Sequence, residues 1–216
     1  MSKTLVRILL ADDHDVVRKG LRGLLEVNSA WQVCGEATNG RDAVKLAMEL
    51  KPDLAVLDLE MPELNGLEAT RQIKKDLPDL EVLIFTMHET DQFIRDALVA
   101  GARGFVLKAD AGRYLVEAVE ALSRHKPFFT SKASETLLEK FLESTAASIE
   151  ADRLTDRERE IIQLLAEGKG NKEISAILYI SVKTVETHRA AIMRKLKMNS
   201  IVDLVRYAIR NNWIKP

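Results

Sequence analysis

The chain has 216 residues, of which 46% are apolar and 30% charged, a composition typical of globular proteins that excludes disordered and fibrous chains. No apolar run approaches the roughly 20 residues of a membrane-spanning helix, and no signal peptide is recognisable, so we expect a cytoplasmic protein without a membrane partner. The single cysteine, Cys34, excludes an internal disulfide and a multi-cysteine metal site.

Charge is distributed unevenly along the chain. Residues 1–130 carry 17 basic and 21 acidic side chains, residues 131–152 carry 2 and 5, and residues 153–216 carry 13 and 7. The net charges are therefore −4, −3 and +6. A basic module of about 60 residues behind an acidic one indicates a nucleic-acid-binding part, although a basic surface is often only a solvated one.

Strand-length apolar runs alternate with helical periodicity over the first 123 residues. The alternation predicts a doubly wound α/β domain with a five-stranded parallel sheet and helices on both faces. Its strands are expected in five runs: Val6–Ala11, Gln32–Ala37, Leu54–Leu59, Glu81–Thr86 and Gly104–Lys108. We place this domain at residues 1–124 and a partly helical linker at 125–152, with a helical stretch at Ser134–Leu142.

Residues 153–216 show only helical patterns, which predict a small all-α domain of four short helices. Thr155 with Glu158 forms a capping box before the first helix, and Gly168 ends it. The other expected caps are Asn171 for the second helix, Ser181 for the third, and Ser200 with Asp203 for the fourth.

Chemically distinctive side chains stand where the predicted strands end. In a parallel sheet these ends share one edge, where ligands bind. Clustered carboxylates attract Mg²⁺ or Mn²⁺, one carboxylate can accept a phosphoryl group, and a lysine can neutralise its charge. The residues concerned are Asp12, Asp13, Asp58, Thr86 and Lys108. Any one of them alone is more often a turn former or cap.

Residues 1–124 resemble a response-regulator receiver domain, which has a flavodoxin-like sheet of strand order 2-1-3-4-5. The matching motifs are Leu9-Leu-Ala-Asp-Asp-His14, Leu57-Asp-Leu-Glu-Met-Pro62 with Asn65-Gly66, Thr86, and Gly104-Phe-Val-Leu-Lys108. The resemblance implies that Asp58 is the phosphoacceptor. It implies metal binding by Asp12, Asp13, Asp58 and the Glu60 backbone carbonyl, and a switch formed by Thr86 and Phe105, although Phe105 is equally well an ordinary core aromatic.

Two positions near the expected site depart from the common receiver pattern, and two more lie close to key residues. Ala109 follows the lysine where many receivers have a cis proline, and Met87 follows Thr86 where a small residue is usual. Glu60 and His88 each lie two residues beyond a key position. Our hypothesis is that Met87, His88 and Glu60 modulate access to Asp58 and hydrolysis of its phosphoryl group; solvated side chains without a role are the alternative.

The second and third predicted helices have the proportions of a helix-turn-helix. The outer face of the third suits a DNA major groove, with a merely solvated helix as the alternative. Residues 153–216 resemble the LuxR-type DNA-binding domain through Leu154-Thr-Asp-Arg-Glu-Arg-Glu160, Glu167-Gly-Lys-Gly-Asn-Lys-Glu-Ile174 and Ser181-Val-Lys-Thr-Val-Glu-Thr-His-Arg189. The resemblance implies DNA contacts by Lys183, Thr184, Glu186, Thr187, Arg189, Ala190, Arg194 and Lys195.

Together the two matches resemble the NarL/FixJ class of two-component response regulators. They imply a sensor histidine kinase and double-stranded DNA as partners, RNA polymerase as a further one, and a homodimer on activation through the last helix, Ser200–Arg210. The apolar stripe of this helix is equally well explained as part of the core. We therefore expect a transcription regulator and not a turnover enzyme. The rivals are a metal-dependent phosphohydrolase with Asp58 as nucleophile and Glu60 as acid or base, and a regulator that needs no phosphorylation.

Overall fold

The computed structural model describes residues 5–88, 90–130, 154–198, 200–211 and 213–214. The chain divides into two compact units, and the boundary between them falls in the segment 131–153, outside the described residues. The helical stretch expected at Ser134–Leu142 also lies outside them.

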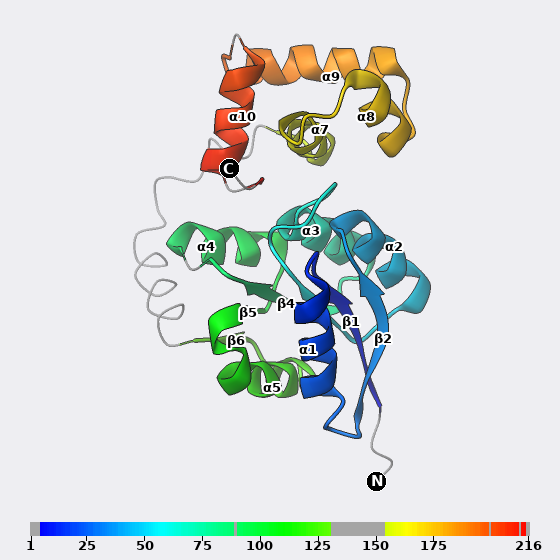
Figure 1. Cartoon of the computed structure of the whole chain (residues 1–216), viewed down its shortest axis with the longest axis vertical. Coiled ribbons are helices and arrows are strands. Elements are labelled where there is room, and N and C mark those ends of the chain that lie inside the picture. The colour runs from blue at the N-terminus through cyan, green and yellow to red at the C-terminus, as the bar shows by residue number, and fades with distance from the viewer. Residues whose placement is uncertain (1–4, 89, 131–153, 199, 212, 215–216) are drawn as a thin grey trace. The chain divides into compact units, whose positions relative to one another are not determined.

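The first unit is a parallel sheet in the order β2-β1-β3-β4-β5-β6 (Figure 1). This arrangement confirms the predicted doubly wound α/β class. The strands are β1 (Val6–Ala11), β2 (Trp31–Ala37), β3 (Leu54–Leu57), β4 (Glu81–Thr86), β5 (Gly104–Leu107) and β6 (Phe128–Phe129). β3 is apolar throughout, and β1 and β4 are apolar over four consecutive residues each, because both faces of the sheet are covered.

The prediction of five strands was wrong by one. After α5 the chain returns to the sheet edge, where Phe128 and Phe129 pair in parallel with Gly104 and Phe105 of β5. A two-residue strand directly after Pro127 carries no periodicity that a sequence pattern can detect. The residues expected to open the linker therefore extend the sheet instead.

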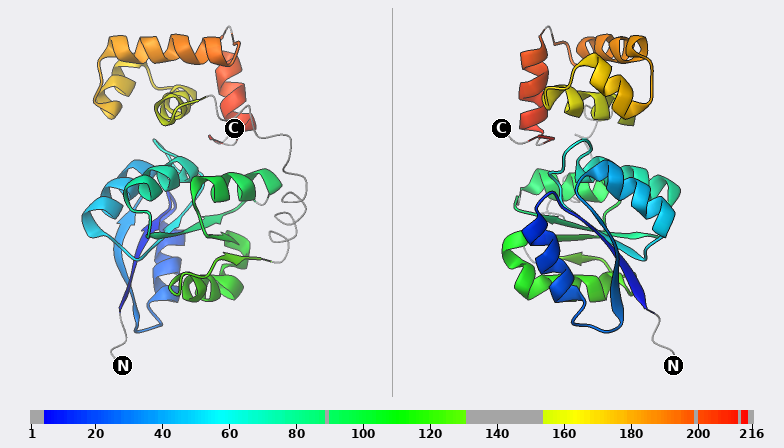
Figure 2. Two further views of the ribbon diagram at one scale, coloured as in Figure 1. Left: turned by 180° about the vertical axis from the view of Figure 1, so that it is seen from behind. Right: turned by 45° about the vertical axis from the view of Figure 1, so that its right-hand side comes forward.

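Helices cover both faces of this sheet (Figure 2). One face packs against α1 (Asp15–Leu25) and α5 (Ala111–Leu122), through a core that includes Leu25 and Leu115. The opposite face packs against α2 (Gly40–Leu50), α3 (Gly66–Asp76) and α4 (Asp91–Ala100), through a core that includes Ile73 and Phe93. A short 3-10 turn, η1 (Lys108–Asp110), connects β5 to α5.

The second unit is all-helical, as predicted. It consists of α7 (Asp156–Ala166), α8 (Asn171–Leu178), α9 (Val182–Lys195) and α10 (Ile201–Arg210) around one apolar core. The Thr155 and Glu158 capping box is present at α7, and the side chains of Ser181 and Ser200 cap α9 and α10 as expected.

The expected cap of α8 was wrong. Gly170 is the N-cap, and its backbone N–H donates to the Glu173 carboxylate at 2.8 Å. Asn171 is instead the first helical residue, and its side-chain oxygen accepts a hydrogen bond from Arg189 of α9. The Asn171 side chain thus makes a tertiary contact with Arg189 instead of capping α8.

Candidate functional site

The expected strand-end residues meet at the carboxyl edge of the sheet. Asp12 follows β1, Asp58 follows β3 and Lys108 follows β5, and the two carboxylates are 1% and 3% exposed. The Lys108 ammonium lies 2.6 Å from Asp12 Oδ2 and 2.7 Å from Asp58 Oδ2. Residues separated by 96 positions in the sequence therefore form one buried ionic cluster.

The electrostatics of this cluster are dominated by its burial. Loss of solvation raises the pKa of Asp58 to about 6; the Lys108 charge and hydrogen bond oppose the shift, and the neighbouring Asp12 and Asp13 charges add to it. For Lys108, burial lowers the pKa, but the Asp58 charge and the hydrogen bonds to both carboxylates outweigh it, so the net shift is upward. Asp58 is thus ionised at neutral pH but held in a form that the fold disfavours.

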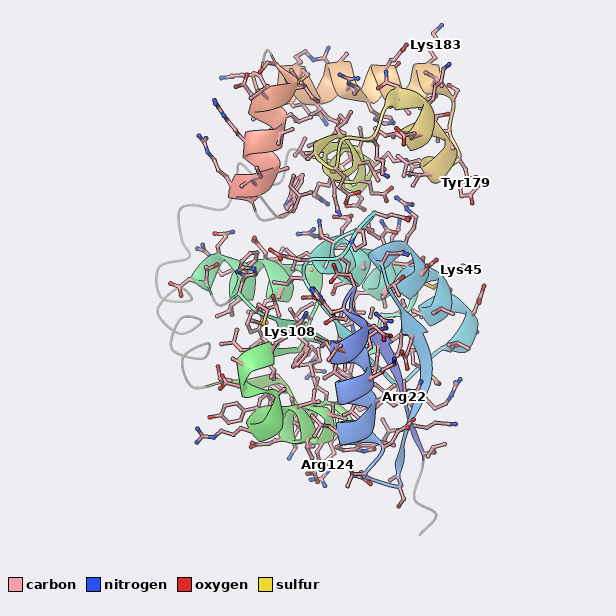
Figure 3. All side chains as sticks on the ribbon, in the orientation of Figure 1. Arg22, Lys45, Lys108, Arg124, Tyr179 and Lys183 are labelled. Atoms are coloured by element: carbon pink, nitrogen blue, oxygen red, sulfur yellow. The ribbon has the colours of Figure 1, made fainter. Side chains whose placement is uncertain are left out.

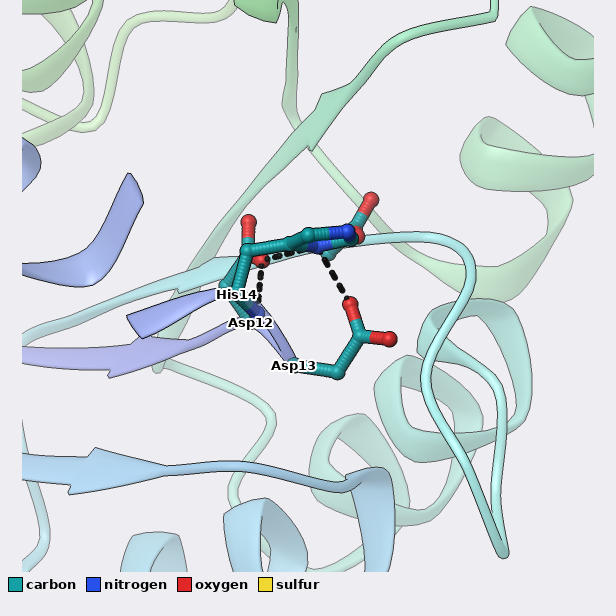
Figure 4. A group of neighbouring side chains, drawn as sticks. Asp12, Asp13 and His14 are labelled. Carbon is teal, nitrogen blue, oxygen red and sulfur yellow. Dashed lines mark hydrogen bonds and ion pairs between the residues drawn. The ribbon is translucent and has the colours of Figure 1, made fainter. Parts of the chain in front are cut away.

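Asp13 and His14 lie next to Asp12 and belong to the same cluster (Figure 4). His14 Nδ1 lies 2.6 Å from Asp13 Oδ1 and 3.1 Å from Asp12 Oδ1, and the His14 backbone N–H donates to Asp12 Oδ1 at 2.8 Å. Potential ligand atoms of Asp12, Asp13, His14 and Asp58 all lie within 4.8 Å of one another. Sequence reasoning gave His14 no role, although its place directly after the two aspartates was a usable signal.

A closely packed glycine fixes the loop that carries Asp58. A Cβ atom at Gly66 would lie 2.0 Å from the Asp58 carbonyl oxygen, and the Gly66 N–H donates to the Leu59 carbonyl at 2.8 Å. The preceding residue, Asn65, caps α3 by accepting from the Glu68 N–H. The Asn65-Gly66 pair therefore lets α3 begin in direct contact with the backbone of Asp58.

Thr86 and Phe105, the expected switch pair, are both inside the first unit. Thr86 is fully buried at the end of β4, and its hydroxyl accepts a hydrogen bond from the His88 N–H at 3.3 Å. Phe105 on the neighbouring strand β5 is 1% exposed and belongs to the core beneath α3 and α4. In this structure the aromatic ring therefore occupies an inward position.

Of the three residues expected to modulate hydrolysis at Asp58, two form a pair and the third is exposed. His88 Nε2 lies 3.2 Å from Glu60 Oε1, so these two side chains pair with each other. The Glu60 side chain is 12% exposed and the His88 side chain 49%. Met87 is 68% exposed. Glu60 and His88 thus come together as a pair, whereas most of the Met87 side chain faces solvent.

In the second unit, most of the expected DNA-contacting residues lie on one exposed face of α9. Figure 3 shows Lys183 projecting outward from this helix. Val185 and Ile192, on the inner face of α9, are fully buried. The exposed set comprises Lys183, Glu186, Thr187, Ala190 and Arg194, with Thr184 half-buried beside it.

Two of the expected phosphate-contacting cations also make contacts within the unit. Arg189 Nη1 donates to Asn171 Oδ1 of α8 at 2.7 Å, and Lys195 Nζ donates to Glu158 Oε2 of α7 at 2.6 Å. Glu158 is 3% exposed, so the second contact ties α9 to a buried carboxylate. Both cations therefore have a structural role in the unit itself.

α10 divides its apolar residues between the core and the surface. Leu204 and Ala208 are buried, whereas Ile201 and Val202 are 41% and 53% exposed. The helix thus anchors the unit and still presents apolar side chains near its N-terminus. None of the helices in the described part of the chain combines the length and apolar character needed to cross a bilayer.

Comparisons with known proteins agree with this two-part organisation. Residues 8–120 match the family model of the response regulator receiver domain, and residues 152–208 match the bacterial regulatory proteins of the luxR family. The transcriptional regulatory protein LiaR of Bacillus subtilis (strain 168) is 38% identical over 210 residues, which cover 97% of this chain and 100% of LiaR. The response regulator protein VraR of Staphylococcus aureus (strain Mu3) is 37% identical, with coverage of 97% and 99%.

Solved structures show the same likeness. RcsB of Salmonella enterica serovar Typhimurium, bound to promoter P1flhDC in the presence of the phosphomimetic BeF3−, matches with a TM-score of 0.59 and 28% sequence identity. The match covers 94% of this chain and 98% of that chain. A LuxR-family two-component response regulator from Aurantimonas sp. SI85-9A1 is 37% identical, with a TM-score of 0.60 over 63% of this chain and 97% of that chain.

Proposed function

The chain belongs to the response regulators that join a receiver domain to a LuxR-type DNA-binding domain, and from this premise we propose that Asp58 is its phosphoacceptor. A receiver domain implies a sensor histidine kinase as the phosphoryl donor. Phosphorylation of Asp58 then controls dimerisation and DNA binding by residues 153–216, and thereby transcription. Because its target is the chromosome, the protein acts in the cytoplasm.

The observation that carries this proposal is the contact of Lys108 with Asp58. With a pKa of about 6, Asp58 is ionised at neutral pH and offers a carboxylate oxygen to the phosphorus atom of the donor. A P–O bond to Asp58 forms while the P–N bond of the donor phosphohistidine breaks, and the leaving imidazole nitrogen takes a proton. Lys108, 2.7 Å from Asp58, is placed to balance the charge of the transferred group.

The donor set fits a hard divalent cation. Three carboxylates with ligand atoms within 4.8 Å of one another offer the oxygens that Mg²⁺ prefers, and Mn²⁺ accepts the same ligands. We assign its binding to Asp12, Asp13, Asp58 and the Glu60 backbone carbonyl, where the cation supplies charge neutralisation for phosphoryl transfer. Asp12 and Asp58 meanwhile keep Lys108 oriented toward the place where the phosphoryl group arrives.

In this proposal, neighbouring residues respond to phosphorylation of Asp58 and set the lifetime of the acyl phosphate. The buried Thr86 hydroxyl exchanges its contact with the His88 N–H for one with the phosphoryl oxygens, and Phe105 responds to that movement. The Glu60 and His88 pair and the adjacent Met87 set how fast water reaches and hydrolyses the acyl phosphate. Because Glu60 is paired with His88, we favour slow self-dephosphorylation over steady turnover as an enzyme.

DNA binding is assigned to the exposed face of α9. Glu186, Thr187 and Ala190 face the bases in this proposal, while cations of α9 contact phosphates. A homodimer that forms through α10 holds two half-sites about one helical turn apart and raises affinity. The solved structure of RcsB bound to a promoter supports a role for this chain in DNA binding, and RNA polymerase is a further partner that we propose. The phosphate-contacting set is Lys183, Thr184, Arg189, Arg194 and Lys195.

Asp58→Asn tests the proposal in the full-length chain. The protein is incubated with Mg²⁺ and acetyl phosphate, and acyl phosphate is detected as a mobility shift on phosphate-binding gels, together with binding to DNA fragments. We expect labelling and tighter DNA binding for the wild type and for the control Asp53→Asn, whose carboxyl lies outside the cluster and accepts from the Arg7 N–H. Labelling of Asp58→Asn at the wild-type level would reject the assigned phosphoacceptor.

A further inference from the structure

α1 contributes a buried cation next to the acidic cluster. The Arg18 side chain is 10% exposed, and its guanidinium makes three contacts with different segments. Nη1 donates to the Asp12 carbonyl oxygen at 2.7 Å, Nη2 donates to Asp15 Oδ1 at 3.0 Å, and Nε lies 3.4 Å from Glu36 Oε2. The guanidinium spreads its donors over three nitrogen atoms in a rigid plane, whereas a lysine carries all its donors on one nitrogen. Arg18 therefore joins the end of β1 to the start of α1 and to β2.

The contact with the Asp12 carbonyl bears directly on Asp13. The Asp12 N–H is already fixed, because it donates to the Ala37 carbonyl of β2 at 3.2 Å. The hydrogen bond from Arg18 holds the Asp12 carbonyl, and because the peptide bond is planar it also holds the plane of the Asp12–Asp13 peptide. That plane sets where the Asp13 N and Cα atoms lie, and thus the point from which the Asp13 side chain extends.

Charge alone would give Arg18 the opposite effect on a metal site. A cation close to a divalent-ion site repels the ion, so removing its charge should tighten metal binding. Removing a clamp that orients the carboxylates should weaken metal binding instead. The sign of the change therefore separates the two roles.

We propose that Arg18 is a positioning residue, which holds the Asp12–Asp13 peptide in the orientation needed for divalent-cation binding and hence for phosphorylation. This inference rests on the proposed function of the cluster. It concerns a residue outside the acidic set, whose action passes through the backbone of Asp12.

Arg22 provides a matched control on the same helix (Figure 3). It lies one turn after Arg18 and pairs with the same carboxylate, with Nε 2.7 Å and Nη2 2.6 Å from Glu36 Oε1. Its other ion pair is with Glu26 of the helix end, and not with the Asp12 loop. Arg22→Met thus removes the same charge and the same Glu36 partnership while the Asp12 carbonyl keeps its donor.

The first measurement is the dissociation constant for Mg²⁺, obtained by isothermal titration calorimetry on full-length protein. We expect Arg18→Met to weaken binding about tenfold, the lower end of what the loss of a ligand-orienting partner causes. Arg18→Lys, which keeps the charge, should also weaken it, and Arg22→Met should leave it within about twofold of the wild type. Equal or tighter binding by a folded Arg18→Met protein would overturn the inference. If circular dichroism shows Arg18→Met to be unfolded, Arg18→Lys decides by the same criterion.

The second measurement is the rate of labelling by acetyl phosphate as a function of Mg²⁺ concentration. We expect Arg18→Met to need more Mg²⁺ for half of its maximal rate and to reach the wild-type maximum at saturation. A maximum that stays low at saturating Mg²⁺ would contradict a role through metal binding. A wild-type protein that neither binds Mg²⁺ nor is labelled would instead refute the proposed function itself, and the inference with it.

Discussion

Asp58→Asn should stabilise the first unit when divalent cations are absent. Asp58 is 3% exposed, and burial raises its pKa to about 6, despite the nearby Lys108. At pH 7.5 the folded chain must therefore carry an ionised carboxylate in a place that favours the neutral acid. Asparagine has nearly the same shape without the charge, so it removes this cost and leaves Asp12 as the partner of Lys108.

The magnitude follows from the two pKa values. Raising the pKa from 3.8 to about 6 costs the ionised folded form up to about 3 kcal/mol, because each pH unit between the two values corresponds to about 1.36 kcal/mol. A raised carboxyl pKa stabilises the fold fully only below pH 3.8, and this contribution is lost as pH rises through about 6. The advantage of Asp58→Asn is thus largest above pH 6 and falls to roughly half at pH 5.

Urea unfolding with Trp31 fluorescence measures this effect. Trp31 is 7% exposed on β2 and reports on the first unit once Trp213→Phe removes the other tryptophan. Unfolding is followed at pH 5 and 7.5 in EDTA, with and without Asp58→Asn. The variant should be more stable than the parent by up to about 3 kcal/mol at pH 7.5, and by a smaller margin at pH 5.

Asp53→Asn is the control, because Asp53 is exposed and its carboxylate lies outside the cluster, where it accepts from the Arg7 N–H. This variant should not reproduce the pH-dependent gain of Asp58→Asn. A stability gain for Asp58→Asn that is the same at both pH values, or that Asp53→Asn reproduces, would refute burial as the origin of the effect.

Three further predictions concern other parts of the two units. Gly66→Ala should lower the urea stability of the first unit by at least about 2 kcal/mol and slow its labelling, because the added Cβ would lie 2.0 Å from the Asp58 carbonyl oxygen. Lys183→Ala should reduce the log–log salt slope of DNA binding by about 0.9 and weaken binding to all sequences alike, as measured by fluorescence anisotropy at several salt concentrations. Glu158→Gln should lower the stability of the second unit, followed by Trp213 fluorescence, by about 1–2 kcal/mol at pH 7, because it removes the buried negative charge that pairs with the Lys195 ammonium at 2.6 Å. Burial opposes ionisation of Glu158, but the hydrogen bonds from Lys195 and Thr155 lower its pKa below 4.5; the effect should therefore persist above pH 4.5 and disappear as pH falls through the lowered value.

Sheet topology explains why the cluster could be predicted from sequence. Parallel strands bring their carboxyl ends to one edge, so Asp12, Thr86 and Lys108 needed only correct strand assignments to be placed together. Small errors in strand length did not matter. β3 ends at Leu57 and β5 at Leu107, so Asp58 and Lys108 follow the strands rather than close them, and both still lie at the same edge.

The long-range side-chain contacts around the two sites could not be predicted from the sequence. Arg18 of α1 reaches Glu36 of β2, Arg189 reaches Asn171 on another helix, and Lys195 reaches Glu158 across 37 positions. Long side chains on a helix have many possible partners, and the packing of the whole unit selects among them. The same reason explains the wrong cap of α8, where Asn171 turned toward Arg189.

The stability of the rest of the first unit offsets the unfavourable free energy of its acidic cluster. Buried carboxylates with a single nearby ammonium are unfavourable on their own, yet the apolar strands β1, β3 and β4 and the two cores around them stabilise the sheet that holds them. Neutralisation of Asp58, by protonation or by a cation bound among the three carboxylates, relieves part of this unfavourable free energy. A relief of even 1–2 kcal/mol, about the size of a tenfold change in an equilibrium, is enough to shift a balance between two conformations. The burial that makes ionised Asp58 unfavourable thus also makes the surrounding structure sensitive to the charge at this position.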